Sequence, residues 1–337
     1  MQRYSLNHLR QFFRNLPRQG SVDVEPCWSA LPELPVPSSI DEQFAEAPVA
    51  VVRLNNPDRR NALSCTMMHE LDMAVDLLEN KFQGSCVILS GVGTKAFCAG
   101  ADLRSVETGL TSNEAGSMMS EYMHYILQRW QRLPQITLAA LNGHAVGGGA
   151  ELTTVCDHRI ATEAATIRFV HPKMGISPGW GGGTRLTNLV GRSRALQLIA
   201  GAQQLTSTEA LECGLLDAIA TPDSAAPSNA SASAATDGNG DSSNKAVEAA
   251  LDFARIYLHD DCLNYGRDAV RGIKRVIHAA DSDDDPHRGH SEKEFQDPSG
   301  ATHRAMGHER AVFSSLWGHE AFNFALRRKL NDMKKRS

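Results

Sequence analysis

The fold of this chain is decided by the stretch Leu141-Asn-Gly-His-Ala-Val-Gly-Gly-Gly-Ala-Glu-Leu152. It follows an apolar, strand-like run at 136–141 and leads into a helix-like segment at 150–156. The three glycines in a row indicate a sharp bend, or a place where another group approaches the main chain closely. A helix that begins here points unpaired N–H groups out of its first turn, where the helix dipole favours negative charge, and Glu151 lies in that turn. A tight strand–helix packing point with a surface glutamate explains this stretch equally well.

The composition excludes several classes of protein. A net charge of −5 provides no basic field for nucleic acid, so we expect no nucleic-acid partner. No apolar run approaches the ~20 residues of a membrane span, so we expect no membrane partner. The 7 cysteines are odd in number and form no C-x-x-C pair, which favours reduced thiols in an intracellular protein over disulfides or a zinc site.

The two ends of the chain differ from its middle. Residues 1–47 form a lead-in whose first part carries Arg3, Arg10, Arg14 and Arg18 and no acidic residue before Asp23. This composition is typical of a mitochondrial transit peptide, and a short docking helix over 8–16 explains it as well. Residues 26–48 are rich in proline and acidic residues and are expected to be irregular.

Two insertions interrupt the second half. Residues 222–244 are rich in Ser and Ala and are predicted to be disordered, and 281–304 form a polar insertion. His287 and His290 lie in the second insertion, where a metal site is the less favoured interpretation. The domain organisation is therefore a core over 48–221, a disordered insertion over 222–244, and a helical C-terminal segment over 245–337.

The core alternates strands and helices. Strands are predicted at 49–55, 86–89, 136–141, 159–161 and 166–170. Helices are predicted at 113–132 and around the apolar stripe Met68, Leu71, Val75 and Leu78. This alternation predicts an α/β fold of stacked strand–helix units.

Two common chemistries fit poorly. Gly91-Val-Gly-Thr-Lys-Ala96 matches a loose dinucleotide-binding pattern, but Phe97 and the residues after it continue as a loop and not as a helix. There is no phosphate-binding P-loop, and no G-x-S-x-G motif for a nucleophilic serine.

Three ordered motifs instead resemble the enoyl-CoA hydratase/isomerase (crotonase) superfamily. They are Phe97-Cys-Ala-Gly-Ala-Asp-Leu103, Gly143-His-Ala-Val-Gly-Gly-Gly-Ala-Glu151 and Pro178-Gly-Trp-Gly-Gly-Gly-Thr-Arg-Leu186, and Asn55-Asn-Pro-Asp-Arg-Arg-Asn-Ala-Leu63 and Ala210-Leu-Glu-Cys-Gly-Leu-Leu-Asp217 fit the same pattern. The resemblance covers roughly 48–220. It implies a crotonase-like α/β spiral of stacked ββα units, with C-terminal helices that form trimers or hexamers.

The resemblance also implies an acyl-CoA thioester as the substrate, with no separate cofactor and no metal. Its oxygen is expected to bind the backbone N–H groups of Ala101 and Gly148, which form an oxyanion hole. Two fixed donors, one at a helix N-terminus, stabilise an enolate oxyanion in a dry pocket. Further contacts with the thioester and the CoA phosphates are implied for Arg59, Arg60, Ala99, Gly100, Asp102, Arg104 and Gly147. Taken alone, these arginines are more typical of solvated surface.

Hydratases of this superfamily use two glutamates. Glu151 is at the first position, but the second falls on His171, so paired acid–base handling of water is not expected. The segments Ile167-Arg-Phe-Val-His-Pro-Lys-Met-Gly-Ile-Ser-Pro-Gly-Trp-Gly-Gly182, His308-Glu-Arg310 and Leu316-Trp-Gly318 resemble ethylmalonyl-CoA decarboxylases. The hypothesis is that Glu151 donates a proton or positions the substrate carboxylate, and that His171 orients it.

Alternatives stay open at this point. The chain is also compatible with an enoyl-CoA hydratase/isomerase, or with a CoA-binding protein of the same fold that has no turnover. His171 is equally compatible with a packing role. The resemblance implies a cytosolic location, and import into the mitochondrial matrix through the basic N-terminus is the alternative.

Overall fold

The structure is a computed structural model. It describes residues 4–16, 19–29, 37–220, 242–258, 267–281, 309–316, 322–324, 326–328 and 331. The chain divides into two units, the first comprising Met1–Leu133 and Thr137–Ala254 and the second comprising Pro134–Ile136 and Arg255–Ser337.

Two sheets carry the strands. The larger has the order β1-β2-β3-β5-β7-β10, formed by β1 (Ser21–Cys27), β2 (Val49–Asn55), β3 (Cys86–Gly91), β5 (Ile136–Leu141), β7 (His158–Thr162) and β10 (Ala218–Ala220). The smaller has the order β4-β6-β8-β9, formed by β4 (Ala96–Cys98), β6 (His144–Val146), β8 (Thr166–Arg168) and β9 (Gln204–Thr206). In the smaller sheet β4, β6 and β8 run parallel, and β9 is antiparallel to β8.

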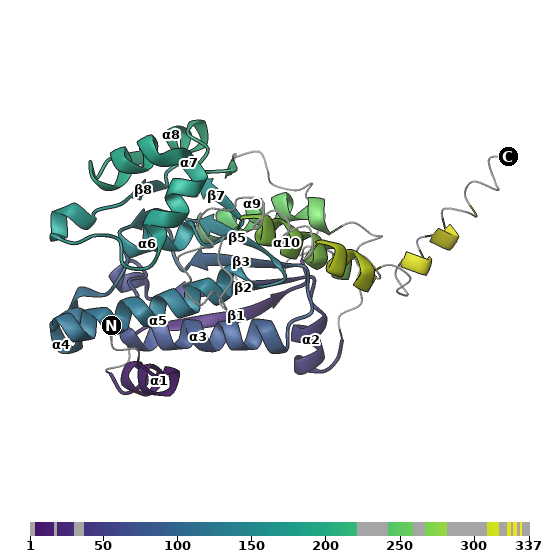
Figure 1. Cartoon of the computed structure of the whole chain (residues 1–337), viewed down its shortest axis with the longest axis horizontal. Coiled ribbons are helices and arrows are strands. Elements are labelled where there is room, and N and C mark those ends of the chain that lie inside the picture. Colours follow the sequence, from purple (N-terminus) through teal and green to yellow (C-terminus); the bar gives the residue numbers. More distant parts are fainter. Residues whose placement is uncertain are drawn as a thin grey trace, which may run out of the picture. The chain divides into compact units, whose positions relative to one another are not determined.

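Helices cover the strands of the first unit (Figure 1). In chain order they are α1 (Leu6–Arg14), α2 (Ile40–Glu46), η1 (Pro57–Arg59), α3 (Cys65–Asn80), α4 (Leu103–Gly109), α5 (Asn113–Gln131), α6 (Gly148–Thr153), η2 (His171–Met174), α7 (Gly182–Ile199), α8 (Ser207–Glu212) and α9 (Ser242–Ala254). The second unit contains η3 (Arg255–Tyr257), α10 (Arg267–Asp281) and helical residues 309–316.

The main core lies between the larger sheet and helices α3 and α5. Alternate residues of β2 and β3, such as Val52 and Leu89, belong to one buried cluster with Leu71 and Trp130 of those helices. The residues between them, such as Val51 and Ile88, are also buried but lie outside that cluster. Because successive side chains of a strand point to opposite faces, both faces of the sheet are covered, and α9 packs against β3, β7 and β10.

The strand and helix predictions are largely confirmed. The predicted strands at 49–55 and 136–141 match β2 and β5, and the helix at 113–132 matches α5 to within one residue. The predicted irregularity of 26–48 is wrong in part, because β1 extends to Cys27 and α2 spans Ile40–Glu46. Strand β1 is at the edge of its sheet and only half-buried, so it tolerates Pro26 and lacks the apolar alternation that identifies inner strands.

The insertions fall mainly outside the described residues. Of the predicted disordered segment 222–244, only the last three residues are described, and they are helical because α9 begins at Ser242. Of the polar insertion 281–304, only Asp281 is described, at the end of α10, so His287 and His290 lie outside the described residues. In the part of the chain that the structure describes, no helix has both the length and the apolar character needed to cross a membrane.

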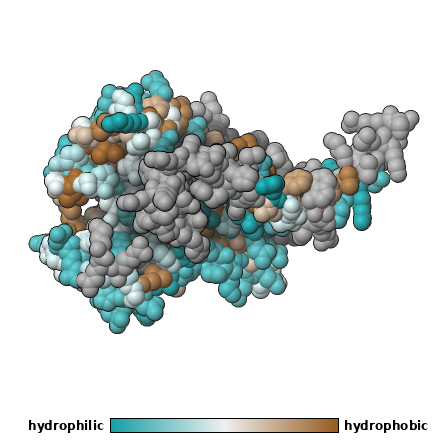
Figure 2. Space-filling view, viewed as in Figure 1, coloured by the Kyte–Doolittle hydropathy of each residue, from teal (hydrophilic) through white to brown (hydrophobic). Residues whose placement is uncertain are grey.

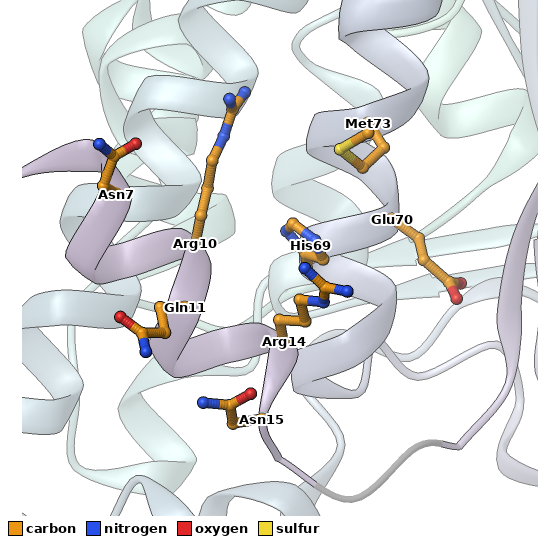
Figure 3. A pocket seen from close by; sticks show the side chains of 8 residues that line it. All are labelled: Asn7, Arg10, Gln11, Arg14, Asn15, His69, Glu70 and Met73. Atoms are coloured by element: carbon orange, nitrogen blue, oxygen red, sulfur yellow. The ribbon is translucent and has the colours of Figure 1, made fainter.

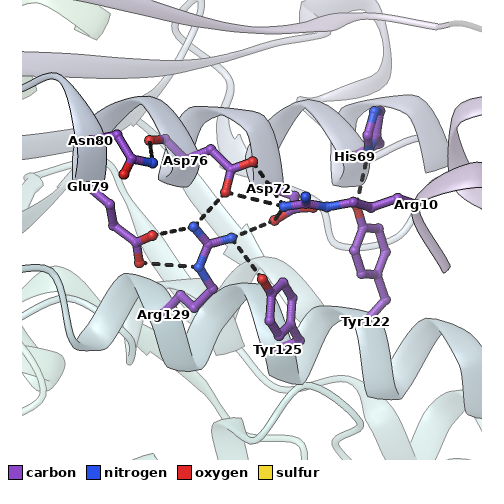
Figure 4. Close-up of polar contacts among 9 residues, drawn as sticks. All are labelled: Arg10, His69, Asp72, Asp76, Glu79, Asn80, Tyr122, Tyr125 and Arg129. Atoms are coloured by element: carbon purple, nitrogen blue, oxygen red, sulfur yellow. Dashed lines mark hydrogen bonds and ion pairs between the residues drawn. The ribbon is translucent and has the colours of Figure 1, made fainter. Parts of the chain in front are cut away.

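The N-terminal basic stretch forms a packed helix. Helix α1 buries Leu9 and Phe13 against the first unit's core, and Phe13 contacts the ring of Tyr122. Arg10 extends from α1 to two carboxylates of α3, donating to Asp72 Oδ2 at 2.6 Å and to Asp76 Oδ2 at 2.9 Å (Figure 4). The docking helix that was one of two interpretations, at 8–16, is present over 6–14, and Arg10 on it has structural partners.

A surface groove of about 860 Å³ runs between α1 and α3 (Figure 3). Its walls are polar side chains of both helices together with one methionine: Asn7, Arg10, Gln11, Arg14, Asn15, His69, Glu70 and Met73. None of the residues predicted to contact the substrate lines this groove. It is a feature of the α1 docking surface and separate from the candidate site.

Candidate active site

The two predicted oxyanion donors lie at the ends of neighbouring strands. Strands β4 and β6 pair in parallel, so the residues that follow them emerge at the same edge of the small sheet. Gly100 has a φ of +91°, and a Cβ added there would be 3.0 Å from the amide nitrogen of Gly148. The main chains of the two predicted donor segments are therefore in direct contact.

The backbone geometry leaves both donors free. Leu63 N–H donates to the carbonyl of Gly100 at 2.7 Å, and Asp102 N–H donates to the carbonyl of Leu63 at 2.9 Å. This parallel bridge directs the N–H of Ala101 away from Leu63. Gly148 is the first residue of α6, where an N–H has no acceptor within the helix. Among the described residues neither amide has a hydrogen-bond acceptor, so both can bind an external oxygen.

The consecutive glycines serve close packing. A Cβ on Gly149 would be 1.9 Å from the carbonyl oxygen of Cys98, and one on Gly148 would be 2.4 Å from Cζ3 of the Trp180 ring. Gly147 precedes the helix with a φ of +57°, a conformation that favours glycine. Both interpretations of the sequence apply to the glycines: they are a packing point, and they expose a helix N-terminus.

Asn61 ties the segment of Ala101 to the larger sheet. This side chain is fully buried, and its amide nitrogen donates to the carbonyls of Val92 at 2.9 Å and Ala96 at 2.8 Å. Its oxygen accepts from the N–H of Asn56 at 3.0 Å. The turn Asn56-Pro-Asp-Arg-Arg-Asn61 thus fixes the start of β4, the strand that leads to the segment of the predicted donor Ala101.

Replacing Asn61 with alanine is expected to lower the free energy of unfolding by about 2 kcal/mol, because it removes the acceptor of the buried Asn56 N–H and one donor from each of the Val92 and Ala96 carbonyls. Urea denaturation followed by circular dichroism measures this change. Asn55→Ala is the matched control, since Asn55 is only half-buried and bonds one side chain, Asp23. Equal effects of the two substitutions would show that Asn61 does not hold this turn.

Glu151 is buried and surrounded by donors. Its side chain is 2% exposed, so the interpretation of a surface glutamate is wrong. Oε1 accepts from His171 Nε2 at 2.9 Å and from Gly179 N–H at 3.4 Å. Oε2 accepts from the N–H groups of Trp180 at 2.9 Å and Gly182 at 2.8 Å. The helix N-terminus that this carboxylate caps is that of α7, while its own helix, α6, begins at Gly148.

His171 lies beside Glu151 as the second predicted member of the pair. It begins η2, and its ring is buried and stacks with Phe169. Nε2 bonds Glu151, whereas Nδ1 is enclosed and has no hydrogen-bond partner among the described residues. Because the carboxylate oxygen is an acceptor, the Nε2–H group of the ring is the donor in its hydrogen bond with Glu151.

Two residues near Glu151 were missed by sequence reasoning. Trp180 packs its indole on Gly148, and Arg185 donates to the carbonyl of Trp180 at 2.8 Å and to Thr154 Oγ1 at 3.0 Å. Burial lowers the pKa of Arg185 to about 10, although Glu151 acts in the opposite direction. Both residues lie in the quoted motif Pro178–Leu186, which was the available signal.

The predicted CoA contacts lie around the same edge but remain predictions. Arg60 and Arg104 are exposed and Arg59 is half-buried. Asp102 is buried and caps α4 by accepting from Arg104 N–H at 2.8 Å. With its amide nitrogen towards Asp102, Gln19 bridges Arg59 Nε and Asp102 Oδ2 at 3.3 and 3.2 Å. This carboxylate therefore has a structural role.

The predicted residues thus fall into two groups. Those gathered at one place are Ala99, Gly100, Ala101, Gly147, Gly148, Glu151 and His171. The cationic side chains of Arg59, Arg60 and Arg104 are not bonded to these residues. Within the described ranges, no group of three or more His, Cys, Asp or Glu side chains has an arrangement that could hold a metal ion.

Comparisons with known proteins agree with this geometry. The family described as enoyl-CoA hydratase/isomerase matches residues 45–250, which is more than half of the chain. Proteins named ethylmalonyl-CoA decarboxylase are similar to it. The Xenopus laevis protein is 44% identical over 183 residues, covering 54% of this chain and 60% of its own length. The Homo sapiens protein is 42% identical over 181 residues, covering 54% and 58% respectively. The matched region thus spans about 60% of the length of these relatives.

Solved structures show the same fold. The crystal structure of an enoyl-CoA hydratase from Bacillus anthracis superposes with a TM-score of 0.67 at 26% identity, covering 85% of this chain and 93% of that chain. An enoyl-CoA hydratase from Polaromonas sp. JS666 superposes with a TM-score of 0.68 at 20% identity, covering 93% and 98%. The predicted crotonase-like α/β fold is confirmed, and the chain belongs to the enoyl-CoA hydratase/isomerase family.

Proposed function

We propose that this protein decarboxylates ethylmalonyl-CoA or methylmalonyl-CoA. The observation that supports it best is the pair Glu151–His171, in which a histidine occupies the position of the second glutamate of hydratases. The similarity to proteins named ethylmalonyl-CoA decarboxylase supports the same reaction. A reaction that needs an electron sink and one proton fits this site better than addition of water.

The chemistry follows from the two free amides. The bond between the α-carbon and the carboxylate breaks, carbon dioxide leaves, and the electron pair moves into the thioester to form an enolate. The N–H groups of Ala101 and Gly148 would stabilise the negative oxygen of this enolate, as donors of an oxyanion hole do. One proton then adds to the α-carbon, and the product is the unbranched acyl-CoA. The contact between Gly100 and Gly148 supports this role, because it brings the two donor segments together.

Two other functions are retained. The family match and the hydratase structures favour an enoyl-CoA hydratase/isomerase as the alternative. A protein of this fold that binds CoA without turnover is the second alternative, since fold does not determine activity. The free amides of Ala101 and Gly148 argue against it, because they form a site suited to a developing charge.

The test is parallel incubation with ethylmalonyl-, methylmalonyl- and crotonyl-CoA, followed by mass spectrometry of the acyl-CoA. We expect loss of carbon dioxide from at least one of the first two and no change in crotonyl-CoA. Hydration of crotonyl-CoA without decarboxylation would establish the alternative enzyme. Tight CoA binding without any product would establish the binding protein.

We further propose that the protein works in the cytosol, in fatty acid metabolism, as a homotrimer or hexamer. The resemblance supports this assembly, and so does α10, which exposes the apolar side chains of Ile273 and Ile277 at 58% and 57%. On the same helix Lys274 is buried and donates to the carbonyl of Gln135 at 2.6 Å. Import into the mitochondrial matrix is the alternative, and the structural partners of Arg10 weaken it.

A further inference from the structure

We propose that Glu151 is a positioning residue, which holds His171 and residues 179–182 around the amide of Gly148 and does not itself transfer the proton. This role differs from the hypothesis drawn from the sequence, in which Glu151 donates a proton or positions the substrate carboxylate and His171 orients it. The inference rests on the proposed decarboxylation, because it concerns the step that follows loss of carbon dioxide.

The first argument is that the carboxylate of Glu151 is already occupied. An ionised carboxylate has about four lone-pair sites, two on each oxygen. Three donors lie within 2.9 Å of Glu151: His171 Nε2, Trp180 N–H and Gly182 N–H. A fourth, the N–H of Gly179, lies at 3.4 Å. With a side chain that is 2% exposed, Glu151 has no oxygen left to receive a substrate group.

The second argument is what these bonds hold in place. The segment 179–182 contains Gly181, whose φ of +82° makes a sharp turn before α7. Its anchor at Glu151 sets the position of Trp180, whose ring lies against Gly148 so closely that a Cβ there would be 2.4 Å away. Gly182 is equally close to Glu151, since its own Cβ would lie 2.4 Å from Glu151 Cγ. The carboxylate therefore fixes the wall beside the predicted oxyanion donor.

The third argument concerns helix α6. Gly148 begins this helix and Glu151 lies in its first turn, so the anchored side chain and the predicted donor belong to one rigid turn. Loss of the anchor would let that turn and the segment 179–182 separate. Catalysis would fall because the Gly148 amide loses its position.

A glutamine at position 151 separates positioning from proton transfer. Its amide oxygen can accept from Trp180 and Gly182 as Oε2 does. Its NH₂ group can donate to His171 Nε2, which becomes an acceptor when the ring proton moves to Nδ1. The short bonds are thereby kept, while the side chain has no acidic proton. Alanine removes every bond.

We expect Glu151→Gln to retain kcat within about tenfold of the wild type, and Glu151→Ala to lower it about 100-fold. A general acid at this position would make both variants equally poor, with losses of about 10²–10⁴. Glu163→Gln, which makes the same change on an exposed residue, is the matched control and should leave kcat unchanged. Circular dichroism checks that each variant is folded, and the glutamine variant suffices if the alanine variant is not.

The origin of the proton provides a second measurement. Decarboxylation of ethylmalonyl-CoA in D₂O places one deuterium on the α-carbon of the product. We expect the stereochemistry of this label to be the same in Glu151→Gln as in the wild type. A glutamine variant with a loss of 100-fold or more and a label of altered stereochemistry would overturn the positioning role. A wild type that releases no carbon dioxide would instead overturn the proposed function, so the two failures are distinguishable.

Discussion

Replacing Gly148 with alanine is expected to lower kcat/KM for decarboxylation by about 10²–10³-fold, which is the typical effect of losing one oxyanion donor. The new Cβ would lie 2.4 Å from Cζ3, 2.7 Å from Cη2 and 2.8 Å from Cε3 of Trp180. The Trp180 ring cannot move away from this Cβ, because the residue is only 3% exposed and its backbone N–H is bonded to Glu151. The turn that carries the Gly148 amide must therefore move.

Gly183→Ala is the matched control for this substitution. Gly183 belongs to the neighbouring glycine triplet, but a Cβ there would be at least 3.7 Å from its nearest neighbours, Pro178 and Ile199. Alanine in the first turn of α7 should keep full activity and raise the free energy of unfolding by up to about 1 kcal/mol. Initial rates with ethylmalonyl-CoA and thermal melting of both variants measure the difference. A Gly148→Ala enzyme within threefold of the wild type would remove Gly148 from the oxyanion hole.

The fold was predictable where burial leaves a pattern. Strands β2 and β5 are buried along their length, and their apolar runs are evident in the sequence. Strand β4 is equally buried but only three residues long, and it continues from a glycine-rich turn, so Phe97 was expected in a loop. The same strand excludes the dinucleotide interpretation, because the glycines at 91 and 93 precede a strand where that fold requires a helix.

The site was predictable in part. The motifs implied that Ala101 and Gly148 are close, and the parallel pairing of β4 with β6 brings their segments together. The environment of Glu151 was not predictable. Its donors come from the backbone of residues 179–182, and a backbone N–H group carries no sequence signal. The role of the arginines was also not predictable from the sequence, because Arg60 and Arg104 are exposed and their contacts depend on a ligand.

The largest stability effect is expected at a position away from the site. Replacing Asp72 with alanine should lower the free energy of unfolding by about 3 kcal/mol, because it removes the fully buried carboxylate that joins Arg10, Arg129 and Tyr122, although both arginines keep their bonds to Asp76. Asp72 is fully buried and accepts from Arg10 Nε at 2.6 Å, Arg129 Nη1 at 2.8 Å and Tyr122 Oη at 2.9 Å (Figure 4). Burial and the neighbouring Asp72 raise the pKa of the Tyr122 phenol, which therefore remains a donor.

The loss of stability in Asp72→Ala should be greatest in α1. Arg10 is the residue of α1 that bonds Asp72, and Leu9 and Phe13 are the buried apolar residues of this helix. Limited proteolysis of Asp72→Ala is expected to cleave near α1 at a denaturant concentration that leaves the remaining core protected. Release of α1 would expose the apolar side chains of Leu9 and Phe13, which the native protein buries. On the face drawn in Figure 2, the described residues are largely hydrophilic and the hydrophobic ones lie in separate patches.

Asp76→Ala is the control that separates the effect of burying the Asp72 carboxylate from the effect of removing one negative charge. Asp76 also bonds Arg10 and Arg129, and the same substitution removes the same charge, but its side chain is 30% exposed. Water replaces part of what an exposed carboxylate provides, so we expect a loss below about 1 kcal/mol. Urea denaturation of both variants in low and high salt completes the comparison. If the free energy of unfolding falls equally in the two variants, and the loss vanishes in high salt, the network acts through screened surface charge. If the loss stays larger for Asp72→Ala in high salt, the effect comes from the burial of Asp72 with its partners.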